Sequence, residues 1–397
     1  MKLTVTTTVL LISTVVAIDL DVSSKESICS AASTIAKGVM DYYEGTRYGG
    51  VVGMFQQPYY WWEAGEAFGS LLDNWYYCQN SQYQAVISDA IIAQCNAPAY
   101  DFMPLNQTVT EANDDQVVWG IVVMAAAEHN FPLPDGTGAS WAEMAENVAD
   151  SMFARWDPDN CNGGLRWQIF PNMSGWDYKN AISNGGLFHL ASRLYRYTDD
   201  TKYLDMATKV YTWMVDINML DTRQSPWALN DGANIGDDNC GEMVNHYYSY
   251  SYGLMLSGAA YLFNATENEE WYSATYSLLI ASADLFFYES VMREYQCYVT
   301  GLCNNDQRSF RSLFSRSLGL TTVMVPQTAF PINWLLSASA RGAAASCSGG
   351  SDGVTCGFDW SKGSWDGWYG LGEQISAMEC IQNLLASSAS APLTQQG

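Results

Sequence analysis

Apolar side chains recur along the chain at the three- and four-residue spacing of amphipathic helices. The segments between these stretches are rich in Gly, Asn, Asp and Pro, and few of them alternate with the two-residue period of a strand. No composition break divides the chain. The pattern therefore predicts a single all-α domain of about eleven or twelve helices. The expected helical stretches are 28–43, 83–95, 117–128, 141–153, 186–197, 203–215, 252–263, 271–287, 311–323, 331–345 and 374–386.

Clusters of polar and aromatic residues recur just before or at the start of helical segments. The interval between most successive clusters corresponds to about one helical hairpin with its loops. Repeated hairpins whose helix starts carry functional residues are typical of a closed toroid, in which the inner helices direct their ends at one central cleft. The clusters occupy residues 59–63, 113–116, 183–186, 248–250 and 368–370.

The overall composition predicts a large folded core and restricts the ligand. The chain has 397 residues, of which 48% are hydrophobic and 14% aromatic. Its 42 acidic and 18 basic side chains give a net charge of −24. This apolar content excludes a disordered chain, and this acidity would repel the phosphate backbone of a nucleic acid. The expected ligand is therefore neutral or cationic, and no nucleic-acid partner is expected.

The N-terminal residues have the pattern of a secretory signal. Lys2 is followed by an apolar stretch over 9–16, and Ala17 completes a small-residue cleavage site. We therefore predict a signal peptide over 1–17, in preference to a buried N-terminal strand, and an exported protein. The mature domain is expected over 18–385, where no apolar run of about 18 residues predicts a membrane span.

The last residues, 386–397, are rich in Ser and Ala and are expected to form a flexible tail. They lack the apolar tail that a lipid-anchor signal requires, so a link to the membrane is expected only through an anchor signal beyond the given sequence. Three sequons agree with export and predict N-glycosylation at Asn106, Asn172 and Asn264.

The cysteines also indicate an oxidising compartment. The chain has ten, all after residue 17, which allows up to five disulfides of open connectivity. Cys297 and Cys303, like Cys347 and Cys356, are close enough to close small loops. A zinc site is the competing interpretation, but no Cys-x-x-Cys occurs and the three histidines are not spaced as paired ligands. We expect neither a metal nor a cofactor.

Two adjacent aspartates in the segment Asn113-Asp114-Asp115-Gln116 are the expected catalytic residues. Asn113 is predicted as a helix N-cap and Gln116 as its capping-box partner, which places both acids in the first helical turn. Their ordinary interpretation is that they complement the helix dipole. The chemical interpretation is a retaining glycosidase, whose two carboxyl groups stand about 5 Å apart. The helix end would keep one ionised as the nucleophile, while burial and like charge would keep the other protonated as the acid.

The aromatic residues support a sugar ligand. Four consecutive rings, Tyr59, Tyr60, Trp61 and Trp62, cannot all face the core from one helix, so some are expected to face a cleft. Rings with an apolar face and a polar edge suit the surfaces of pyranose sugars. A neutral sugar would also explain why so acidic a protein needs no basic residue beside its ligand. The alternative for any single ring is a place in the core.

The segment from Asp231 to Asp238 resembles a calcium-binding loop, but Ala233 occupies a position that requires a ligand. We interpret it first as an acidic loop of the cleft and second as a cation site. No Gly-x-Ser-x-Gly elbow or phosphate-binding glycine loop points to another chemistry.

Together these segments resemble glycoside hydrolase family 76, the endo-α-1,6-mannanases, and within it the fungal cell-wall members. The matching motifs appear in order from about residue 28 to 385. They are Tyr59-Tyr60-Trp61-Trp62-Glu63-Ala64-Gly65, Asn113-Asp114-Asp115-Gln116 with Trp119-Gly120, Gly163-Gly164-Leu165-Arg166-Trp167-Gln168, Lys179-Asn180-Ala181-Ile182-Ser183-Asn184-Gly185-Gly186 and Tyr369-Gly370-Leu371-Gly372-Glu373-Gln374.

The resemblance implies an (α/α)6 toroid in which Asp114 is the nucleophile and Asp115 the acid/base. Two segments depart from the family pattern: Tyr250-Ser251-Tyr252 replaces a Tyr-Asn motif, and Phe310-Arg311-Ser312 replaces a Phe-Lys-Gly segment. The residues expected to contact substrate are Tyr60, Trp61, Trp62, Asn113, Gln116, Asn184, Asp231, Asp238, Tyr250, Tyr252 and Tyr369.

The leading hypothesis is a secreted or wall-associated endo-α-1,6-mannosidase, or a transmannosidase that shares its glycosyl-enzyme intermediate. By the resemblance, its substrate is α-mannan or the mannose core of a glycolipid anchor, with wall glucan as a possible acceptor. The alternative is a non-catalytic wall protein that binds mannan in the same aromatic cleft. The retained aspartates favour the enzyme.

Overall fold

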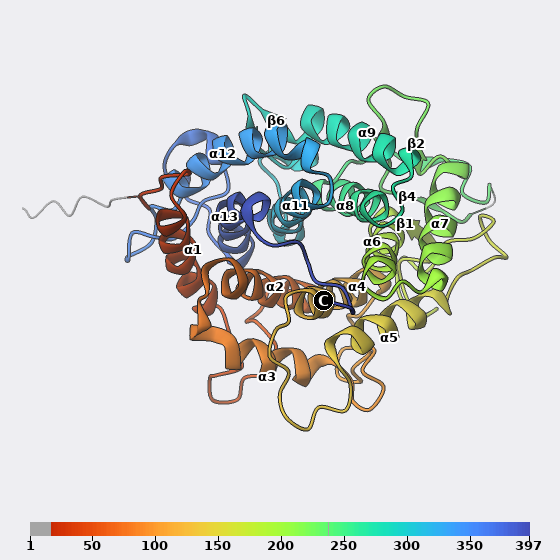
Figure 1. Cartoon of the computed structure of the whole chain (residues 1–397), viewed down its shortest axis with the longest axis horizontal. Coiled ribbons are helices and arrows are strands. Elements are labelled where there is room, and N and C mark those ends of the chain that lie inside the picture. The colour runs from red at the N-terminus through yellow and green to blue at the C-terminus, as the bar shows by residue number, and fades with distance from the viewer. Residues whose placement is uncertain (1–16, 237) are drawn as a thin grey trace, which may run out of the picture.

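Twelve long helices form two concentric rings in the part of the chain that this computed structural model describes, residues 17–236 and 238–397 (Figure 1). The rings alternate along the sequence, so each outer helix is followed by an inner one. The inner helices are α2 (Trp61–Cys78), α4 (Asn113–Glu128), α6 (Ala181–Thr198), α8 (Ser249–Thr266), α11 (Asn305–Met324) and α13 (Leu371–Gln382). The outer helices are α1 (Lys25–Met40), α3 (Gln84–Gln94), α5 (Trp141–Phe153), α7 (Thr201–Asp216), α9 (Glu269–Phe286) and α12 (Ala329–Ser346).

The inner ring closes on itself because each inner helix packs against two others, and α13 returns to α2. The first helix of the chain, α1, packs on the outside of the last, α13, and seals the ring (Figure 1). Strict alternation makes the six inner helices parallel, so all of their N-terminal ends lie on one face. The expected (α/α)6 toroid is confirmed.

Helix α2 is missing from the predicted helical stretches because its sequence lacks a clear amphipathic period. It is buried on nearly all sides, and it carries buried polar residues such as Glu63, Glu66 and Asp73 among the apolar ones. A helix buried all round has no solvent-facing stripe, so its sequence shows no amphipathic period. The other inner helices likewise begin up to six residues before the expected stretches, because their first turns are polar.

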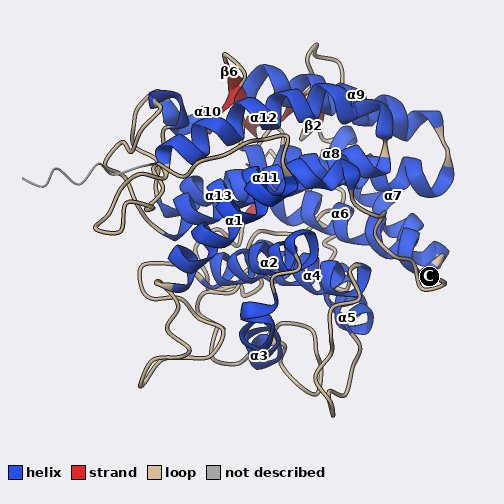
Figure 2. Ribbon diagram, turned by 60° about the vertical axis from the view of Figure 1, so that its left-hand side comes forward, coloured by secondary structure: helices blue, strands red, loops and turns tan. Residues whose placement is uncertain are grey.

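Short strands and turns complete the fold on the loops (Figure 2). A three-stranded antiparallel sheet joins β1 to β4 and β4 to β5, with Lys179 opposite Ala233. The remaining elements are small. The strands are β1 (Tyr178–Asn180), β2 (Leu220–Asp221), β3 (Ala228–Leu229), β4 (Gly232–Asn234), β5 (Met243–Val244), β6 (Phe287–Tyr288) and β7 (Val291–Met292), beside α10 (Tyr295–Tyr298) and the 3-10 turns Ser81–Tyr83, Pro326–Thr328, Trp360–Lys362 and Asn383–Ser388.

Four disulfides link loops and helix ends. Both expected local pairs form, Cys297 with Cys303 and Cys347 with Cys356. Two longer bridges join Cys29 to Cys78 and Cys161 to Cys240. Cys95 and Cys380 are buried and unpaired, so the ten cysteines form four bridges and not five. Among the residues described, none of the helices has the length and apolar character to cross a membrane.

The two ends of the chain carry the predicted signal peptide and the predicted flexible tail. The expected signal peptide lies outside the described residues except for Ala17. The C-terminal segment runs over the face opposite the inner-helix N-termini, where the Leu393 amide donates to the Glu128 carbonyl at 2.9 Å. The Gln395 amide likewise donates to the Tyr197 carbonyl at 2.9 Å, so backbone hydrogen bonds hold the segment expected to be a flexible tail.

The three sequons occupy different settings. Asn106 and Asn172 are exposed in loops. Asn264 is exposed near the end of α8, but its side chain is hydrogen-bonded: Nδ2 donates to the Met324 carbonyl at 3.2 Å and Oδ1 accepts from the Arg196 guanidinium at 2.8 Å.

A buried ion network joins three inner helices deep in the ring. The Arg316 guanidinium of α11 contacts Asp73 and Glu66 of α2 at 2.8 Å each and Glu379 of α13 at 2.5 Å. Burial raises the pKa of Glu66, and it raises that of Glu379 to about 8. Burial also acts upward on Asp73, but Arg316 and His129 outweigh it and leave the pKa of Asp73 lowered. One guanidinium therefore holds together three carboxyl groups removed from water.

Candidate active site

The N-terminal ends of the inner helices enclose a cavity of about 470 Å³. Helices α2, α4, α6, α8 and α11 each contribute residues from their first turns or from the residue before them. The cavity is lined by Tyr60, Trp62, Thr110, Asp114, Asp115, Val118, Trp167, Gln168, Tyr178, Asn180, Ile182, Asp231, Tyr248, Tyr250, Asn304, Asp306, Gln307 and Phe310.

The two expected catalytic aspartates line this cavity side by side in the first turn of α4. The capping arrangement differs from the expected one, because the helix begins at Asn113 and its N-cap is Ala112. Asp115 is the third helical residue, and its Oδ2 accepts the Ala112 amide at 2.8 Å. The Asp115 amide donates to Oδ1 of Asp114 at 3.1 Å. Asp115 therefore takes the capping position assigned to Gln116, and its hydrogen bond fixes its orientation.

The environment makes both carboxyl groups weaker acids than free aspartate, to different extents. Burial raises the pKa of Asp114 to about 7, against the lowering effect of the backbone amides at the helix start. Burial and the neighbouring Asp114 charge raise the pKa of Asp115 well above its ordinary value. Two adjacent carboxyl groups in one cavity do not both ionise readily, so the pair holds a proton in the neutral range. The charge of Asp114 adds to the raised pKa of Asp115, which suits the acid, whereas the backbone amides oppose the rise at Asp114, which suits the nucleophile.

One wall of the cavity is built from stacked aromatic rings. Tyr250 of α8 lies parallel to Phe310 of α11, with ring centroids 3.7 Å apart and planes 5° apart. The ring of Tyr248 packs against Phe310 in a T-shaped arrangement, with centroids 5.4 Å apart. The ring centroid of Trp62, on α2, lies 6.1 Å from that of Phe310. Such a surface can pack against the apolar face of a sugar ring.

The charged residues that line the cavity are all acidic. Besides the pair on α4 they are Asp231, whose Oδ2 accepts the Tyr178 hydroxyl at 2.7 Å, and Asp306, whose Oδ1 accepts the Trp62 indole N–H at 3.0 Å. No lysine or arginine lines the cavity within the described part of the chain. The site therefore favours a neutral or cationic ligand over a phosphate or carboxylate.

Five of the expected substrate contacts lie behind the cavity wall and brace it. Trp61 is 1% exposed, and its indole donates to Gln94 at 2.9 Å. Asn113 donates to the Arg166 carbonyl at 2.8 Å and accepts from Arg155, and Gln116 donates to the Asp101 carbonyl at 2.7 Å. These side chains are held by protein groups and do not face the ligand space.

Asn184 and Tyr252 are the other two bracing residues. Asn184 is buried in α6 and exchanges hydrogen bonds with the backbone of Leu165, accepting its amide at 2.8 Å and donating to its carbonyl at 3.1 Å. The hydroxyl of Tyr252, which is fully buried, accepts the Leu229 amide at 2.7 Å. Both fix loops that lead into the cavity.

Asp238 and Tyr369 also lie outside the cavity, but on the surface. Asp238 is exposed in the loop after β4. Tyr369 is 62% exposed in the segment before α13. Of the eleven expected contacts, the structure gathers four in the cavity: Tyr60, Trp62, Asp231 and Tyr250. Helical spacing could not separate these from their neighbours, because it does not indicate where another helix packs.

The calcium-loop interpretation of residues 231–238 is not supported by the geometry of the described residues. Asp231 is turned toward Tyr178, whereas Asp238 is exposed, and residue 237 is outside the description. No group of three or more His, Cys, Asp or Glu side chains in the described ranges is arranged to hold a metal ion.

Sequence reasoning missed several lining residues that come from the loops and from α11. Trp167, Gln168 and Tyr178 precede α6 and reach the cavity because the Trp167 backbone pairs with Asn113 and with Tyr178. Asn304 and Asp306 begin α11, where Asn304 and Gln307 form a capping box. A helix start with such a box was a usable signal for a further site cluster.

The two departures from the family pattern do not alter the cavity lining. Ser251 is buried in α8 beside the lining residue Tyr250. Arg311 is buried against Phe358 and Trp360, and burial lowers its pKa to about 10. Tyr250 and Phe310 are the members of these two segments that line the cavity.

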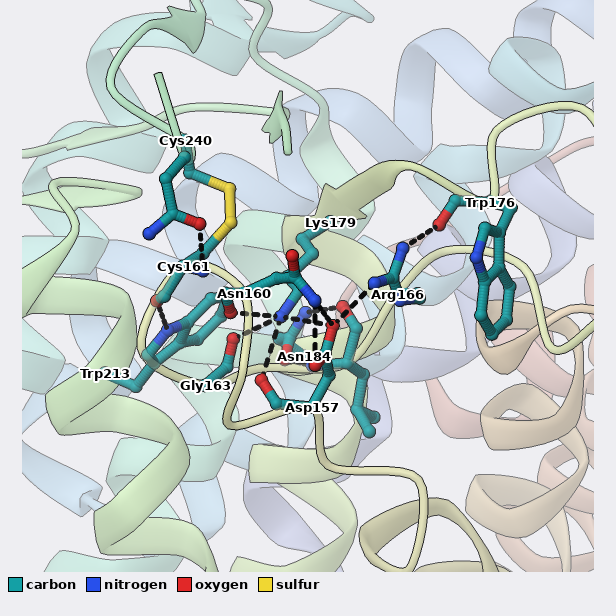
Figure 3. The surroundings of a disulfide bond; sticks show 12 residues. Asp157, Asn160, Cys161, Gly163, Arg166, Trp176, Lys179, Asn184, Trp213 and Cys240 are labelled. Atoms are coloured by element: carbon teal, nitrogen blue, oxygen red, sulfur yellow. Dashed lines mark hydrogen bonds and ion pairs between the residues drawn. A yellow bond between two sulfur atoms is a disulfide. The ribbon is translucent and has the colours of Figure 1, made fainter. Parts of the chain in front are cut away.

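The wall formed by residues 157–180 is held by a buried lysine (Figure 3). The ammonium of Lys179, on β1, donates to the carbonyls of Asp157, Asn160 and Gly163 at 3.1, 2.7 and 2.6 Å. It also pairs with the Asp157 carboxylate at 3.3 Å, which Arg166 contacts at 2.9 Å. A cation among three carbonyls and a carboxylate occupies the centre of this loop as a bound metal ion would.

The same loop is fixed from two other sides. The Cys161–Cys240 disulfide ties it to the loop after β4, and the Trp213 indole donates to the Cys161 carbonyl at 2.8 Å (Figure 3). Because Tyr178 and Asn180 flank Lys179 and line the cavity, the order of this loop determines where they lie.

Replacing Lys179 by methionine is expected to lower the free energy of unfolding by about 2–4 kcal/mol, because it takes the ammonium away from three carbonyls and from the partly buried Asp157 carboxylate, which keeps Arg166. Thermal unfolding and limited proteolysis between residues 157 and 180 would measure the effect. Lys202→Met is the matched control: its pair with Asp150 is half exposed, so about 0–1 kcal/mol is expected. Equal stability of the two variants would contradict the assigned role of Lys179.

Comparison with known proteins agrees with this geometry. The model of the family described as Glycosyl hydrolase family 76 matches residues 27–396. The chain is 50% identical over 382 residues to the mannan endo-1,6-alpha-mannosidase Dfg5 of Saccharomyces cerevisiae, covering 95% of this chain and 82% of that one. It is 52% identical over 385 residues to the mannan endo-1,6-alpha-mannosidase Dcw1 of Candida albicans, covering 95% and 84%.

Solved structures share the toroid. Dfg5 from Chaetomium thermophilum, in complex with glucosamine, superposes with a TM-score of 0.90 at 34% identity over 95% of this chain and 94% of that chain. A Salegentibacter α-1,6-mannanase, in complex with α-1,6-mannotriose, superposes with a TM-score of 0.70 at 17% identity over 90% and 99%. With the family model matched over nearly its whole length, this chain belongs to glycosyl hydrolase family 76.

Proposed function

We propose that this protein is a retaining endo-α-1,6-mannosidase whose nucleophile is Asp114 and whose acid/base is Asp115. The observation that carries the proposal is the pair of adjacent carboxyl groups at the start of α4, in a cavity with an aromatic wall and only acidic charges. The names of the fungal relatives support α-1,6-mannan as the substrate. The Salegentibacter complex adds support, because its protein is an inactive variant with two adjacent aspartates replaced.

The first half of the reaction cleaves the glycosidic bond. The ionised Asp114 carboxylate attacks the anomeric carbon of a mannosyl residue while Asp115 donates its proton to the departing O6 oxygen. The products are a mannosyl ester of Asp114, an Asp115 carboxylate and a free sugar hydroxyl. The surroundings suit this step, because the negative charge of Asp114 opposes ionisation of Asp115, while backbone amides at the helix start favour the ionised form of Asp114.

The second half releases the mannosyl group. Asp115, now a carboxylate, takes a proton from an incoming hydroxyl as its oxygen attacks the anomeric carbon and the Asp114 ester bond breaks. Water gives hydrolysis and a sugar hydroxyl gives transfer, with the same net retention. We propose that wall glucan serves as such an acceptor and that the donor is α-mannan or the mannose core of a glycolipid anchor.

We also propose that the protein works outside the cell, at the wall or the outer face of the membrane. The signal-like residues 1–17, the four disulfides and the sequons support export.

The test incubates the purified protein with linear α-1,6-mannan and follows the anomeric protons of new reducing ends by NMR. Cleavage that first releases α-anomers is the expected result. Addition of a β-glucan oligosaccharide distinguishes transfer, which would give a mannosyl-glucan product. Asp205→Asn, at an exposed position on α7, is the control and should retain activity. Binding of mannan without cleavage or transfer would instead favour the non-catalytic wall protein.

A further inference from the structure

A third carboxylate, Asp306, shares the cavity with the aspartate pair. It is the second residue of α11 and is half-buried, and α11 packs against α2 and α8 in the inner ring. The Trp62 indole N–H donates to its Oδ1 at 3.0 Å. Among the described residues its Oδ2 receives no hydrogen bond, so one oxygen is anchored and the other is available to a ligand.

The start of α11 does not need Asp306 for its own stability. Asn304 is the N-cap, and its side chain accepts the Gln307 amide at 2.9 Å. The Gln307 side chain in turn accepts the Asn304 amide at 3.0 Å, which completes a capping box. Asp306 is therefore available for another role, although the helix start still favours its negative charge.

The basic residue nearest in sequence is committed elsewhere. Arg308 pairs with Glu373 at 2.8 Å and also contacts Asn305, and its guanidinium lies 5.3 Å from the Trp368 ring. Asp306 therefore has one neutral anchor, Trp62, and no cationic partner among the residues described.

We propose that Asp306 is a third functional carboxylate of this site, which binds hydroxyl groups of the sugar through its free oxygen and imposes a negative field on the aspartate pair. The inference rests on the proposed function for the identity of the sugar. It adds a substrate-contacting residue to a reaction otherwise assigned to two acids.

The sugar contact follows from the geometry of the wall. Trp62 holds Asp306 and also lies 6.1 Å from Phe310, so the same indole links the carboxylate to the stacked rings. A pyranose that packs on the rings would bring its edge hydroxyls toward the free oxygen. Hydrogen bonds from hydroxyl groups to a carboxylate are short and strong, and they fix the orientation of the bound residue.

The negative charge of Asp306 acts on titratable groups of α2, α4 and the start of α8. Asp306 adds to the raised pKa of Asp114 and Asp115 on α4, of Glu63 on α2, and of Tyr248 and Tyr250 at the start of α8. Its own pKa is raised by burial, against the lowering effect of the Trp62 hydrogen bond. A negative charge beside the pair opposes further ionisation, so Asp306 helps Asp115 to keep its proton.

The test compares Asp306→Asn with the wild type in the pH dependence of kcat/KM on α-1,6-mannan. The variant keeps the shape of the side chain and an oxygen for Trp62, but loses the charge. Both limbs of the profile should move to lower pH, by about one unit, because both carboxyl groups then ionise more readily. The maximum should fall about 100-fold through the lost sugar contact.

Asp231→Asn is the matched control, because Asp231 lines the same cavity but is held by Tyr178, and Asp306 rather than Asp231 is among the main causes of the raised pKa of both catalytic aspartates. It should leave both limbs where they are, whatever it does to KM. If the pH profile of Asp306→Asn does not shift, or if Asp231→Asn shifts it equally, the proposed electrostatic effect of Asp306 on the aspartate pair is wrong. If the maximum kcat/KM of Asp306→Asn is unchanged, the proposed sugar contact is wrong.

A measurement without substrate separates this inference from the proposed function. Carboxyl ¹³C NMR of aspartate-labelled protein would follow the titration of Asp114 and Asp115 in the wild type and in Asp306→Asn. Lower midpoints in the variant support the field even if no mannan is cleaved. Identical midpoints refute it even if the protein proves to be a mannosidase.

Discussion

Replacing Asp114 by asparagine is expected to reduce cleavage of α-1,6-mannan by about 10⁴-fold or more, the loss typical of a missing nucleophile. The amide cannot attack the anomeric carbon, so no glycosyl-enzyme forms and both hydrolysis and transfer stop. The fold should be unaffected, because the Asp114 carboxylate accepts the neighbouring Asp115 amide, and an asparagine oxygen can accept it as well. Initial rates and the thermal unfolding temperature would be measured together.

Two further variants distinguish the roles of the adjacent acids. Asp115→Asn should lose about 10²- to 10⁴-fold on mannan but much less on an aryl mannoside whose leaving group needs no proton. Asp114→Ala with azide should form a mannosyl azide of inverted configuration, because the azide takes the place of the carboxylate. If Asp115→Asn fails on the aryl mannoside while Asp114→Asn cleaves it, the two assignments are reversed.

Replacing Arg316 by methionine is expected to be the most damaging change to stability, lowering the free energy of unfolding by about 3–5 kcal/mol. Methionine fills much of the same space but leaves Glu66, Asp73 and Glu379 without the cation that all three share. A buried carboxylate without a partner either remains charged at high cost or binds a proton.

The loss should depend on pH with a defined sign. Without Arg316, the folded-state pKa values of Glu66 and Glu379 rise further above the unfolded values of about 4, and the pKa of Asp73, which Arg316 lowers, rises as well. Folding then takes up protons, so the deficit is smallest at pH 4–5 and grows as the pH rises through the folded-state values. Urea unfolding at pH 5 and pH 8 measures this. Arg341→Met, at an exposed position on α12, is the control and should change stability by less than about 0.5 kcal/mol at either pH.

The four consecutive rings at the start of α2 show how much of the site was predictable. The sequence indicated that they could not all face one way. The structure buries Tyr59, whose hydroxyl accepts the Leu371 amide at 3.0 Å, and packs Trp61 at 5.6 Å from Trp119. It leaves Tyr60 and Trp62 to the cavity. The partners of the buried rings lie on other helices, and the periodicity of one helix cannot identify them.

Asp306 shows the opposite case, a site residue whose sequence context marks a helix start but no particular chemistry. It lies within the capping box of Asn304 and Gln307, and its anchor, Trp62, is 244 residues away in sequence. The aspartate pair could be recognised because its two members are adjacent, and the charge of Asp114 raises the pKa of Asp115. A single acid acquires its role only from what the fold places opposite it.

The sequence by itself determined the helical architecture, the export-type cysteines, the aspartate pair and the resemblance to family 76. These depend on short-range patterns, such as helical spacing, adjacent charges and motif order, which are complete within a few residues. Tertiary structure alone decided which polar residues face the cavity, because closing the inner ring brings helix starts from residue 60 to residue 310 together on one face. It also decided that the buried cations of Lys179 and Arg316 meet acidic partners, since a buried charge is stable only where distant segments supply its partners.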